Sequence, residues 1–221
     1  MTSTPRNARS RTRKDPAERR AEILETAARL ALERGLERVT MQLVAQELGV
    51  RPGLISHYFA TIDALLCEAF TRAVTREREA LLPGAGQESP EGQEGQEASP
   101  ARQLSAFLRR IGRKDFADLG RLWLNARHLS RYRPTLREVL AEQEAVMRGV
   151  LTRVIEEGVR AGEFDTPDPE GACLVILVVI DGLGAYANDD SGYTHPALDD
   201  LLFTTAEREL GAGPGVLVRE G

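Results

Sequence analysis

The sequence predicts an all-α protein in which an N-terminal three-helix helix-turn-helix domain is joined to a C-terminal helical bundle. Apolar residues recur at helical spacing along most of the 221 residues, and glycine and proline separate the resulting segments. Strand patterns do not alternate with the helical ones, so a parallel α/β fold is not indicated. With 42% hydrophobic residues, the chain can bury one compact core, or a core carrying a small module.

Residues 1–14 carry five positive charges and no negative charge. This composition cannot pack into a core, so we expect a disordered basic arm. The whole chain has a net charge of -5, but residues 1–70 carry +2 and residues 71–221 carry -7. Phosphates attract such an arm, and Arg13 and Lys14 are its candidate contacts. A tail that merely increases solubility is the alternative.

The first helix is expected between Asp15 and Gly35. Asp15 is a good N-cap, Pro16 suits the first helical position, and Glu18 completes a capping-box pattern. Gly35 supplies the residue with positive φ that ends the helix. The same reasoning places three further helices, the second and the fourth behind the caps Thr40 and Thr61, over 41–48, 52–58 and 62–82.

The second and third predicted helices form a helix-turn-helix. Two short helices that cross steeply need a small side chain where they touch and a left-handed residue in the turn. Ala45 and Gly49 stand at those two positions, and Ile55 and Phe59 supply apolar support. An ordinary αα-hairpin within a bundle is the alternative.

A polar edge of the third helix faces outward if Ile55 faces the core. Arg51 takes the N-cap position, where Ser or Thr would be better by about 0.5–2 kcal/mol, and its charge opposes the helix dipole. That cost favours a use, such as a bidentate contact to guanine or a phosphate clamp, although exposed charges often cost little. Gly53 removes a side chain where the backbone could approach a groove. The edge comprises Arg51, Pro52, Gly53, Ser56, His57 and Tyr58.

Residues 83–100 contain glycine, proline, glutamine and glutamate but no aromatic or β-branched residue, so we expect a disordered loop. The chain thus divides into the arm (1–14), the helix-turn-helix domain (15–60) and a helical ligand-binding and dimerisation domain (61–212). Further helices are expected over 103–112, 116–131, 135–161, 169–187 and 196–210. Within them, residues 173–180 also fit a buried strand by periodicity alone.

The helix expected over 169–187 is apolar nearly all round, which fits burial against both its own core and a partner. A homodimer would read two half-sites about 34–36 Å apart, or a multiple of that, and so specify a longer sequence. Burial within a monomer is the alternative. The candidate interface residues are Val175, Val179, Gly182, Gly184 and Ala185.

Several bundle side chains are candidates for a ligand pocket. Aromatic residues at helical spacing more often form plain core. Trp123 could face a cation through its ring, with Asp181 to neutralise the charge. The full candidate set is Phe116, Trp123, His128, Tyr132, Phe164, Asp181 and Tyr186.

Catalysis and metal binding are not expected. The three histidines form no Glu-x-x-His pair, so a di-iron type of site is not indicated, and no cofactor motif is present. Cys67 and Cys173 are better explained as small apolar fillers than as redox sensors. With no apolar signal segment and no bilayer-length apolar run, we expect a cytoplasmic protein.

Residues 23–70, "ILETAARLALERGLERVTMQLVAQELGVRPGLISHYFATIDALLCEAF", resemble the DNA-binding domain of the TetR family of bacterial transcriptional regulators. "IDGL", residues 180–183, is also similar to the later helices of many members. The stretch "ISHYF" is similar to the choline-responsive regulators of the betaine pathway within that family.

The resemblance implies a homodimer whose third helix enters the major groove and whose bundle binds a small molecule that releases the DNA. Most members are repressors. It implies phosphate contacts at Thr40 and Gln42. It also implies base contacts at Arg51, Pro52, Gly53 and His57, and backbone contacts at Ser56 and Tyr58. The family commonly has lysine at the position of Ile62 and tyrosine at that of Ser56, so two usual contacts are absent. A helical protein-interaction adaptor that reuses the fold is the alternative function.

Overall fold

The computed structural model describes residues 15–82, 99–111, 117–187 and 195–217. All regular structure in these ranges is helical, which confirms the predicted all-α class. Arg13, Lys14 and Phe116, and most of the predicted loop 83–100, lie outside the described residues. The elements are α1 (Pro16–Arg34), η1 (Leu36–Arg38), α2 (Met41–Glu47), α3 (Pro52–Tyr58), α4 (Ile62–Leu81), α5 (Pro100–Ile111), α6 (Ala117–Ser130), α7 (Pro134–Arg160), α8 (Pro169–Ala187) and α9 (Pro196–Glu209).

The caps of the N-terminal helices act as the sequence predicts. The Asp15 carboxylate accepts hydrogen bonds from the backbone N–H groups of Ala17 and Glu18. Thr40 and Thr61 cap α2 and α4 in the same way, each accepting from the N–H three residues on. These side chains satisfy donors that a helix start leaves without partners.

Two details differ from the sequence-based expectation. A short 3-10 helix, η1, follows α1, because Gly35 leaves α1 with φ 93° and ψ 145° and the chain does not continue as a simple loop. Helix α5 begins at Pro100 and not at Gln103. The Ser99 hydroxyl accepts from the Arg102 N–H and so caps this earlier start.

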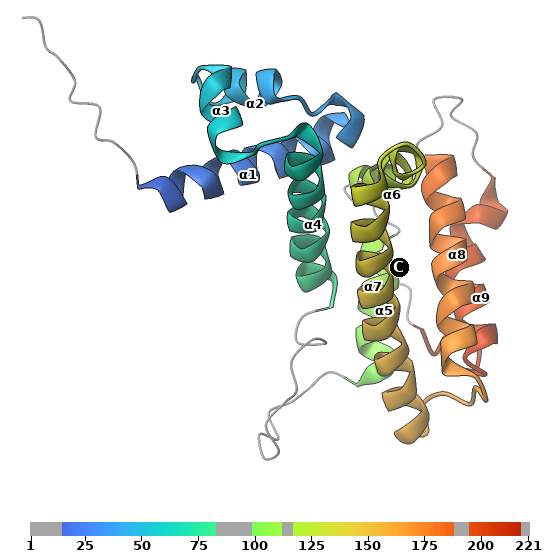
Figure 1. The fold of residues 1–221 in the computed structure, drawn as a ribbon. Coiled ribbons are helices and arrows are strands. Elements are labelled where there is room, and N and C mark those ends of the chain that lie inside the picture. Colours follow the sequence, from blue (N-terminus) through green and yellow to red (C-terminus); the bar gives the residue numbers. More distant parts are fainter. Residues whose placement is uncertain (1–14, 83–98, 112–116, 188–194, 218–221) are drawn as a thin grey trace, which may run out of the picture.

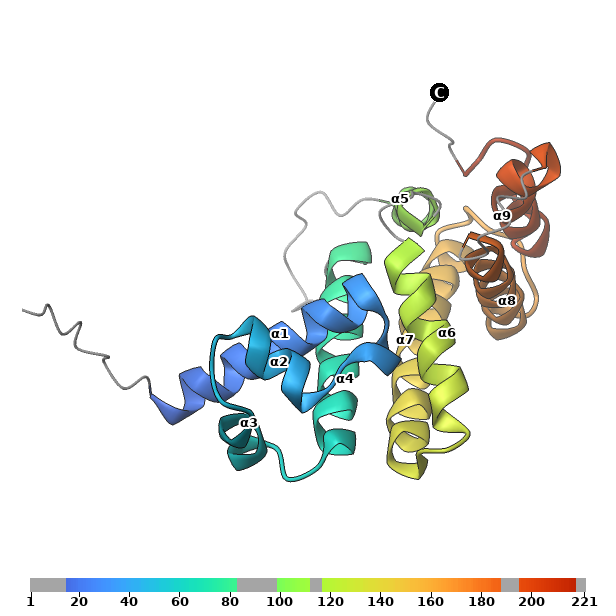
Figure 2. The same ribbon diagram turned by 90° about the horizontal axis from the view of Figure 1, so that it is seen from above.

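The helices form a small head and a larger bundle (Figure 1). Helices α1, α2 and α3, with η1, are called the head below. Helix α4 packs along α1 and leads from the head into the bundle, where it contacts α7 and α6. Figure 2, a view from above, places the head at one side of the molecule and α8 with α9 at the other.

One hydrophobic core runs through both parts. In the head it includes Ile23 and Ile55, and in the bundle it includes Leu122 and Ile176, all fully buried. Phe70 of α4 lies between the two parts, with its ring edge-to-face against Trp123 of α6 at 5.2 Å. Burying a side chain of this size contributes about 1.5–3 kcal/mol, so the head and the bundle share stabilising contacts.

Candidate functional site

The turn between α2 and α3 closes as a Schellman motif. Gly49 adopts φ 62°, its N–H donates to the Gln46 carbonyl, and the Val50 N–H donates to the Ala45 carbonyl at 2.9 Å. Ala45 is 1% exposed at the crossing of the two helices. The small residue and the left-handed residue therefore stand where the helix-turn-helix prediction requires them.

The inner face of α3 anchors the helix. Ile55 is fully buried and Phe59, which follows the helix, is 2% exposed. The Arg20 guanidinium of α1 lies over the Phe59 ring at 4.8 Å and forms an ion pair with Glu68 of α4. These contacts fix the rotation of α3 and so determine which residues face solvent.

The outer face of α3 is polar. Five of the six residues predicted for this edge are exposed, and the sixth, Tyr58, is half-buried. The His57 and Tyr58 rings contact each other edge-on at 5.2 Å. The exposed residues are Arg51, Pro52, Gly53, Ser56 and His57. Their exposure leaves a surface with hydrogen-bonding groups available for contacts outside the chain.

No contact among the described residues explains why arginine stands at position 51 and glycine at position 53. Arg51 is the N-cap of α3, and its side chain makes no capping hydrogen bond. A Cβ at Gly53 would have no atom within 4 Å, and Gly53 has no positive φ. Glycine in a helix costs about 0.5–1 kcal/mol relative to alanine, and no contact within the described chain requires it at Gly53, as is also the case at Gly149 of α7.

Three further predicted contact residues, Thr40, Ser56 and Gln42, differ in what they already contact within the chain. The Thr40 hydroxyl accepts from the Leu43 N–H at 3.0 Å, and the Ser56 hydroxyl donates to the Met41 sulfur at 3.4 Å. Gln42 is exposed on α2, two residues after the cap. Thr40 and Gln42 therefore lie exposed at the start of α2, while the Ser56 hydroxyl is already hydrogen-bonded to Met41.

Phe116 lies outside the described residues, and the other six residues predicted for a ligand pocket differ in their surroundings. Phe164 is 5% exposed and packs on α7 so closely that a Cβ at Gly158 would lie 2.1 Å from its ring. Tyr186 on α8 is 54% exposed. The exposed His128 contacts Tyr132, which is 73% exposed, edge-on at 5.8 Å.

Trp123 and Asp181 are brought together by a residue that the sequence analysis did not single out. The Arg127 guanidinium lies 5.7 Å from the centre of the Trp123 ring. It donates to Asp181 of α8 at 3.0 Å and to Glu144 of α7 at 3.0 Å. Trp123 thus faces a cation of the chain itself, whereas the sequence-based prediction concerned the cation of a bound ligand. The four-residue spacing of Trp123 and Arg127 could have predicted that they lie on the same face of one helix. The contact with Glu144 could not be predicted, because it depends on how α7 packs against α6.

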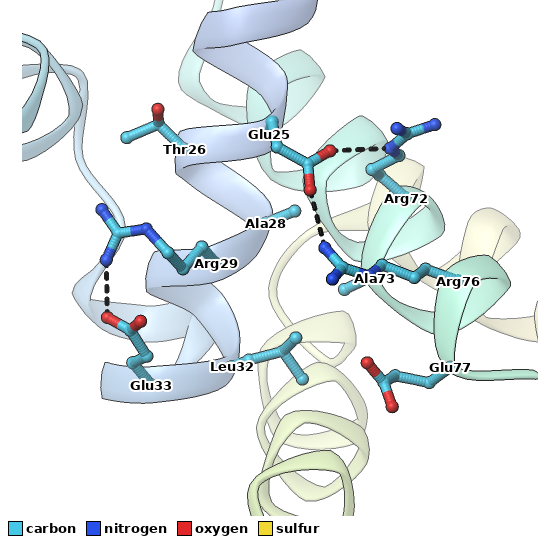
Figure 3. Close-up of a pocket in the computed structure, with 10 residues that line it drawn as sticks. All are labelled: Glu25, Thr26, Ala28, Arg29, Leu32, Glu33, Arg72, Ala73, Arg76 and Glu77. Atoms are coloured by element: carbon cyan, nitrogen blue, oxygen red, sulfur yellow. Dashed lines mark hydrogen bonds and ion pairs between the residues drawn. The ribbon is translucent and has the colours of Figure 1, made fainter. Parts of the chain in front are cut away.

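A groove of about 310 Å³ lies between α1 and α4. Figure 3 shows that charged side chains dominate its walls: Glu25 bridges Arg72 and Arg76 of α4, and Arg29 pairs with Glu33. Glu33 and Glu47 raise the pKa of Arg29 through hydrogen bonds. None of these residues was predicted as a ligand contact, because their pairing depends on how α1 packs against α4.

Helix α8 carries an exposed apolar stripe. Leu174 is 53% exposed and Val178 is 61% exposed, and Gly182, Ala185 and Tyr186 continue the same face. The predicted interface residues Val175 and Val179 are half-buried. Gly184 faces α6, where a Cβ would lie 3.7 Å from the Gly120 Cα. Of the predicted interface residues, Gly182 and Ala185 thus lie on the exposed face, and Val175, Val179 and Gly184 are half-buried.

Residues Pro169–Tyr186 of α8 are long and apolar enough to cross a membrane, judged by length and composition only, and 17% of this stretch is buried inside the chain. One such helix is weak evidence for a membrane span. Core and interface helices of soluble proteins have the same composition.

The described residues contain no group of three or more His, Cys, Asp or Glu side chains placed to hold a metal ion. Both described cysteines are free thiols. Burial raises the pKa of Cys67 and of Cys173, so both thiols are less reactive than exposed ones.

Two family models match the chain. Residues 23–69 match the model described as bacterial regulatory proteins of the tetR family. Residues 100–210, half of the chain, match the C-terminal region of BetI-type transcriptional repressors. A curated relative, the HTH-type transcriptional regulator PksA of Bacillus subtilis, is 39% identical over 64 residues, which cover 29% of this chain and 30% of that protein.

Solved structures with the same fold extend over most of the chain. A transcriptional regulator from Saccharomonospora viridis, in complex with choline, is 22% identical, has a TM-score of 0.68, and the match covers 88% of this chain and 98% of that one. The fatty acid degradation regulator FadR from Bacillus halodurans is 19% identical with a TM-score of 0.62, and the match covers 90% and 97%. At these identities the likeness concerns the fold.

Proposed function

Because the chain belongs to the TetR family of bacterial transcriptional regulators, we propose that it is a ligand-responsive repressor that a small-molecule effector releases from a palindromic operator. The observation that carries the proposal is the outer edge of α3, where Arg51 and Gly53 stand at a cost and without an internal partner among the described residues. Both features suit a helix whose backbone and side chains approach a major groove.

In this proposal the contacts divide by chemistry. Arg51, Pro52, Gly53 and His57 face base edges. Thr40 and Gln42 at the start of α2 contact phosphates, as do Ser56 and Tyr58 near the end of α3. Arg13 and Lys14 of the basic arm add phosphate contacts. Phosphate contacts position the protein on the duplex, whereas base contacts select the sequence.

The active species in this proposal is a homodimer. The exposed stripe of α8 is apolar, and the described residues of the chain itself leave it uncovered. Contiguous exposed apolar surface on a soluble protein usually marks an interaction site. The interface then includes Leu174, Val178, Gly182, Ala185 and Tyr186, while Val175, Val179 and Gly184 support it from within the chain. This arrangement fits a cytoplasmic protein.

The effector region is proposed for the bundle around Trp123 and Asp181. Because Arg127 occupies the face of Trp123, a cationic effector would have to displace that guanidinium. Choline, the ligand in the Saccharomonospora viridis structure, is therefore the first compound to test. The other candidates, Phe116, His128, Tyr132, Phe164 and Tyr186, remain predictions.

Substitutions in α3 test the proposal. Arg51→Ala and His57→Ala should each weaken binding to the selected operator by about 1–3 kcal/mol and change binding to random DNA little, because base contacts carry sequence information. Fluorescence anisotropy with both duplexes measures the difference. Equal losses on both duplexes would show that the two residues touch only phosphate. A helical interaction adaptor would bind neither duplex.

A further inference from the structure

We propose that α6 is a coupling strut that holds the C-terminal end of α1 through Arg121 and Asn125. On this view a displacement of α6 within the bundle moves the head, and Arg121 and Asn125 are positioning residues for the DNA contact. The inference rests on the proposed function and names the residues that would connect effector binding to DNA release.

Arg121 closes the end of α1 from another helix. Its Nη2 donates to the Leu32 carbonyl at 3.0 Å and to the Glu33 carbonyl at 3.3 Å, and Asp118 accepts from the same nitrogen at 2.5 Å. The last carbonyls of a helix have no partner within it, and the helix dipole favours a cation there. Most helices obtain such a cap from their own next residues. Here α6 provides it, so the end of α1 depends on the position of α6.

Asn125, one turn further along α6, binds the first residue of η1. Its Oδ1 accepts from the Leu36 N–H at 3.3 Å, and Leu36 is fully buried. A Cβ on Gly35 would lie 2.9 Å from the same Oδ1 and 2.6 Å from Glu37. Gly35 also needs its φ of 93°. Glycine is therefore required at position 35 for two reasons, the positive φ and the short distance to Asn125.

Another side of α6 contacts the bundle. A Cβ on Gly184 of α8 would lie 3.7 Å from the Gly120 Cα, and Arg127 binds Asp181 of α8 and Glu144 of α7. Arg121 and Asn125 are four residues apart and share one face of the helix, whereas Gly120 and Arg127 share another. One rigid helix therefore contacts the end of the head on one side and the helix with the exposed apolar stripe on the other.

The head is also joined to α4, but through ion pairs between exposed side chains. Glu25 of α1 binds Arg72 and Arg76, which are 58% and 69% exposed (Figure 3). Exposed ion pairs are weak and salt-dependent. The bonds of Arg121 and Asn125 reach backbone groups, which cannot rotate away without moving α1 or η1. Hydrogen bonds to backbone groups are therefore better suited to transmit a displacement of α6 than the exposed ion pairs are.

Hydrogen exchange measured by mass spectrometry tests the strut in Arg121→Ala and Asn125→Ala. In the free proteins, exchange in residues 31–39 should be about two- to tenfold faster than in the unsubstituted protein, the range expected for one lost hydrogen bond. Arg76→Ala is the matched control, because it removes an arginine that binds α1 from α4. It should leave residues 31–39 unchanged.

A second measurement uses saturating operator duplex, selected from random DNA, so that differences in affinity do not enter. In the unsubstituted protein and in Arg76→Ala, the duplex should slow exchange in the head and also in residues 117–130 of α6. In Arg121→Ala and Asn125→Ala, the protection should stop at the head. A role confined to stability would not change how far the protection spreads. Circular dichroism verifies folding, and Asn125→Ala, the smaller change, serves if Arg121→Ala does not fold.

Two results would overturn the strut. One is unchanged exchange in residues 31–39 of both variants, and the other is protection of α6 by DNA that survives in both. If no duplex binds the unsubstituted protein, the proposed function fails, and the exchange of the free proteins alone then decides on the clamp between α6 and α1.

Discussion

Gly53 is a residue whose identity the fold does not require. It has ordinary helical backbone and open space where a Cβ would stand. Gly53→Ala should therefore raise the free energy of unfolding by about 0.5–1 kcal/mol. The added methyl group should at the same time weaken operator binding, by up to about 1–3 kcal/mol if it displaces a base contact. Thermal unfolding and fluorescence anisotropy measure the two effects.

Gly149→Ala is the matched control for Gly53→Ala. Gly149 lies exposed within α7 and also has nothing within 4 Å of its Cβ position. This substitution should stabilise the protein by a similar amount and leave DNA binding unchanged. If Gly53→Ala bound the operator as tightly as Gly149→Ala does, close approach at Gly53 would be refuted.

The two thiols should react slowly in the native protein. Burial raises the pKa of Cys67 and of Cys173 above the usual value, so a smaller fraction of each is thiolate at any pH below that raised value. Titration with a chromogenic disulfide at pH 8 should give slow labelling of the folded protein and fast labelling in guanidinium chloride. Fast labelling of a native thiol would point to a reactive cysteine instead of an apolar filler.

The sequence predicted the exposure of single residues where that exposure depends on the geometry of one helix. The exposure of Arg51 and His57 follows from the burial of Ile55 by helix geometry, and the structure agrees. Residues whose role depends on a distant helix were not predictable in this way. Arg121 meets α1, and Arg127 meets α7 and α8, through packing that no local pattern encodes.

At the scale of the element, the caps and turn residues predicted most helix boundaries to within one or two positions, because capping is a local interaction. The face of α8 was harder to predict. The helix is apolar nearly all round, so periodicity gave no preferred direction. The exposed stripe contains the predicted Gly182 and Ala185 together with Leu174 and Val178, whereas Val175 and Val179 are half-buried. Gly184 faces Gly120 of α6 within the same chain.

The stripe on α8 gives a testable prediction at the scale of the element. Val178→Asp should convert the expected dimer, twice 24.3 kDa, into a folded monomer. The residue is 61% exposed in the single chain, and a buried unpaired charge in a subunit interface is costly. Size-exclusion chromatography with light scattering measures the mass. Val146→Asp on α7, at a site 42% exposed, is the control and should remain dimeric. A dimeric Val178→Asp would exclude this face as the interface.

At the scale of the whole molecule, the head and the bundle share one core and are joined along two routes, α4 and α6. Helix α4 is continuous in sequence with the head, so its role could be predicted. The contact of α6 with α1 and η1 could not, because about 90 residues separate the bonded groups. Figure 2 shows α3 at one side of the molecule, α8 toward the other side and α6 between them. The proposed DNA-contacting edge, the proposed strut and the helix with the apolar stripe therefore follow one another across the molecule.

The central claim is that the outer edge of α3 reads duplex DNA as one half of a two-fold assembly. Selection of bound fragments from randomised duplex DNA, followed by sequencing, tests it most directly. Enrichment of a palindrome whose half-sites lie about one helical turn, or a multiple of it, apart is the expected result. Recovery of fragments with no shared sequence, or of a single unrepeated site, would contradict the claim.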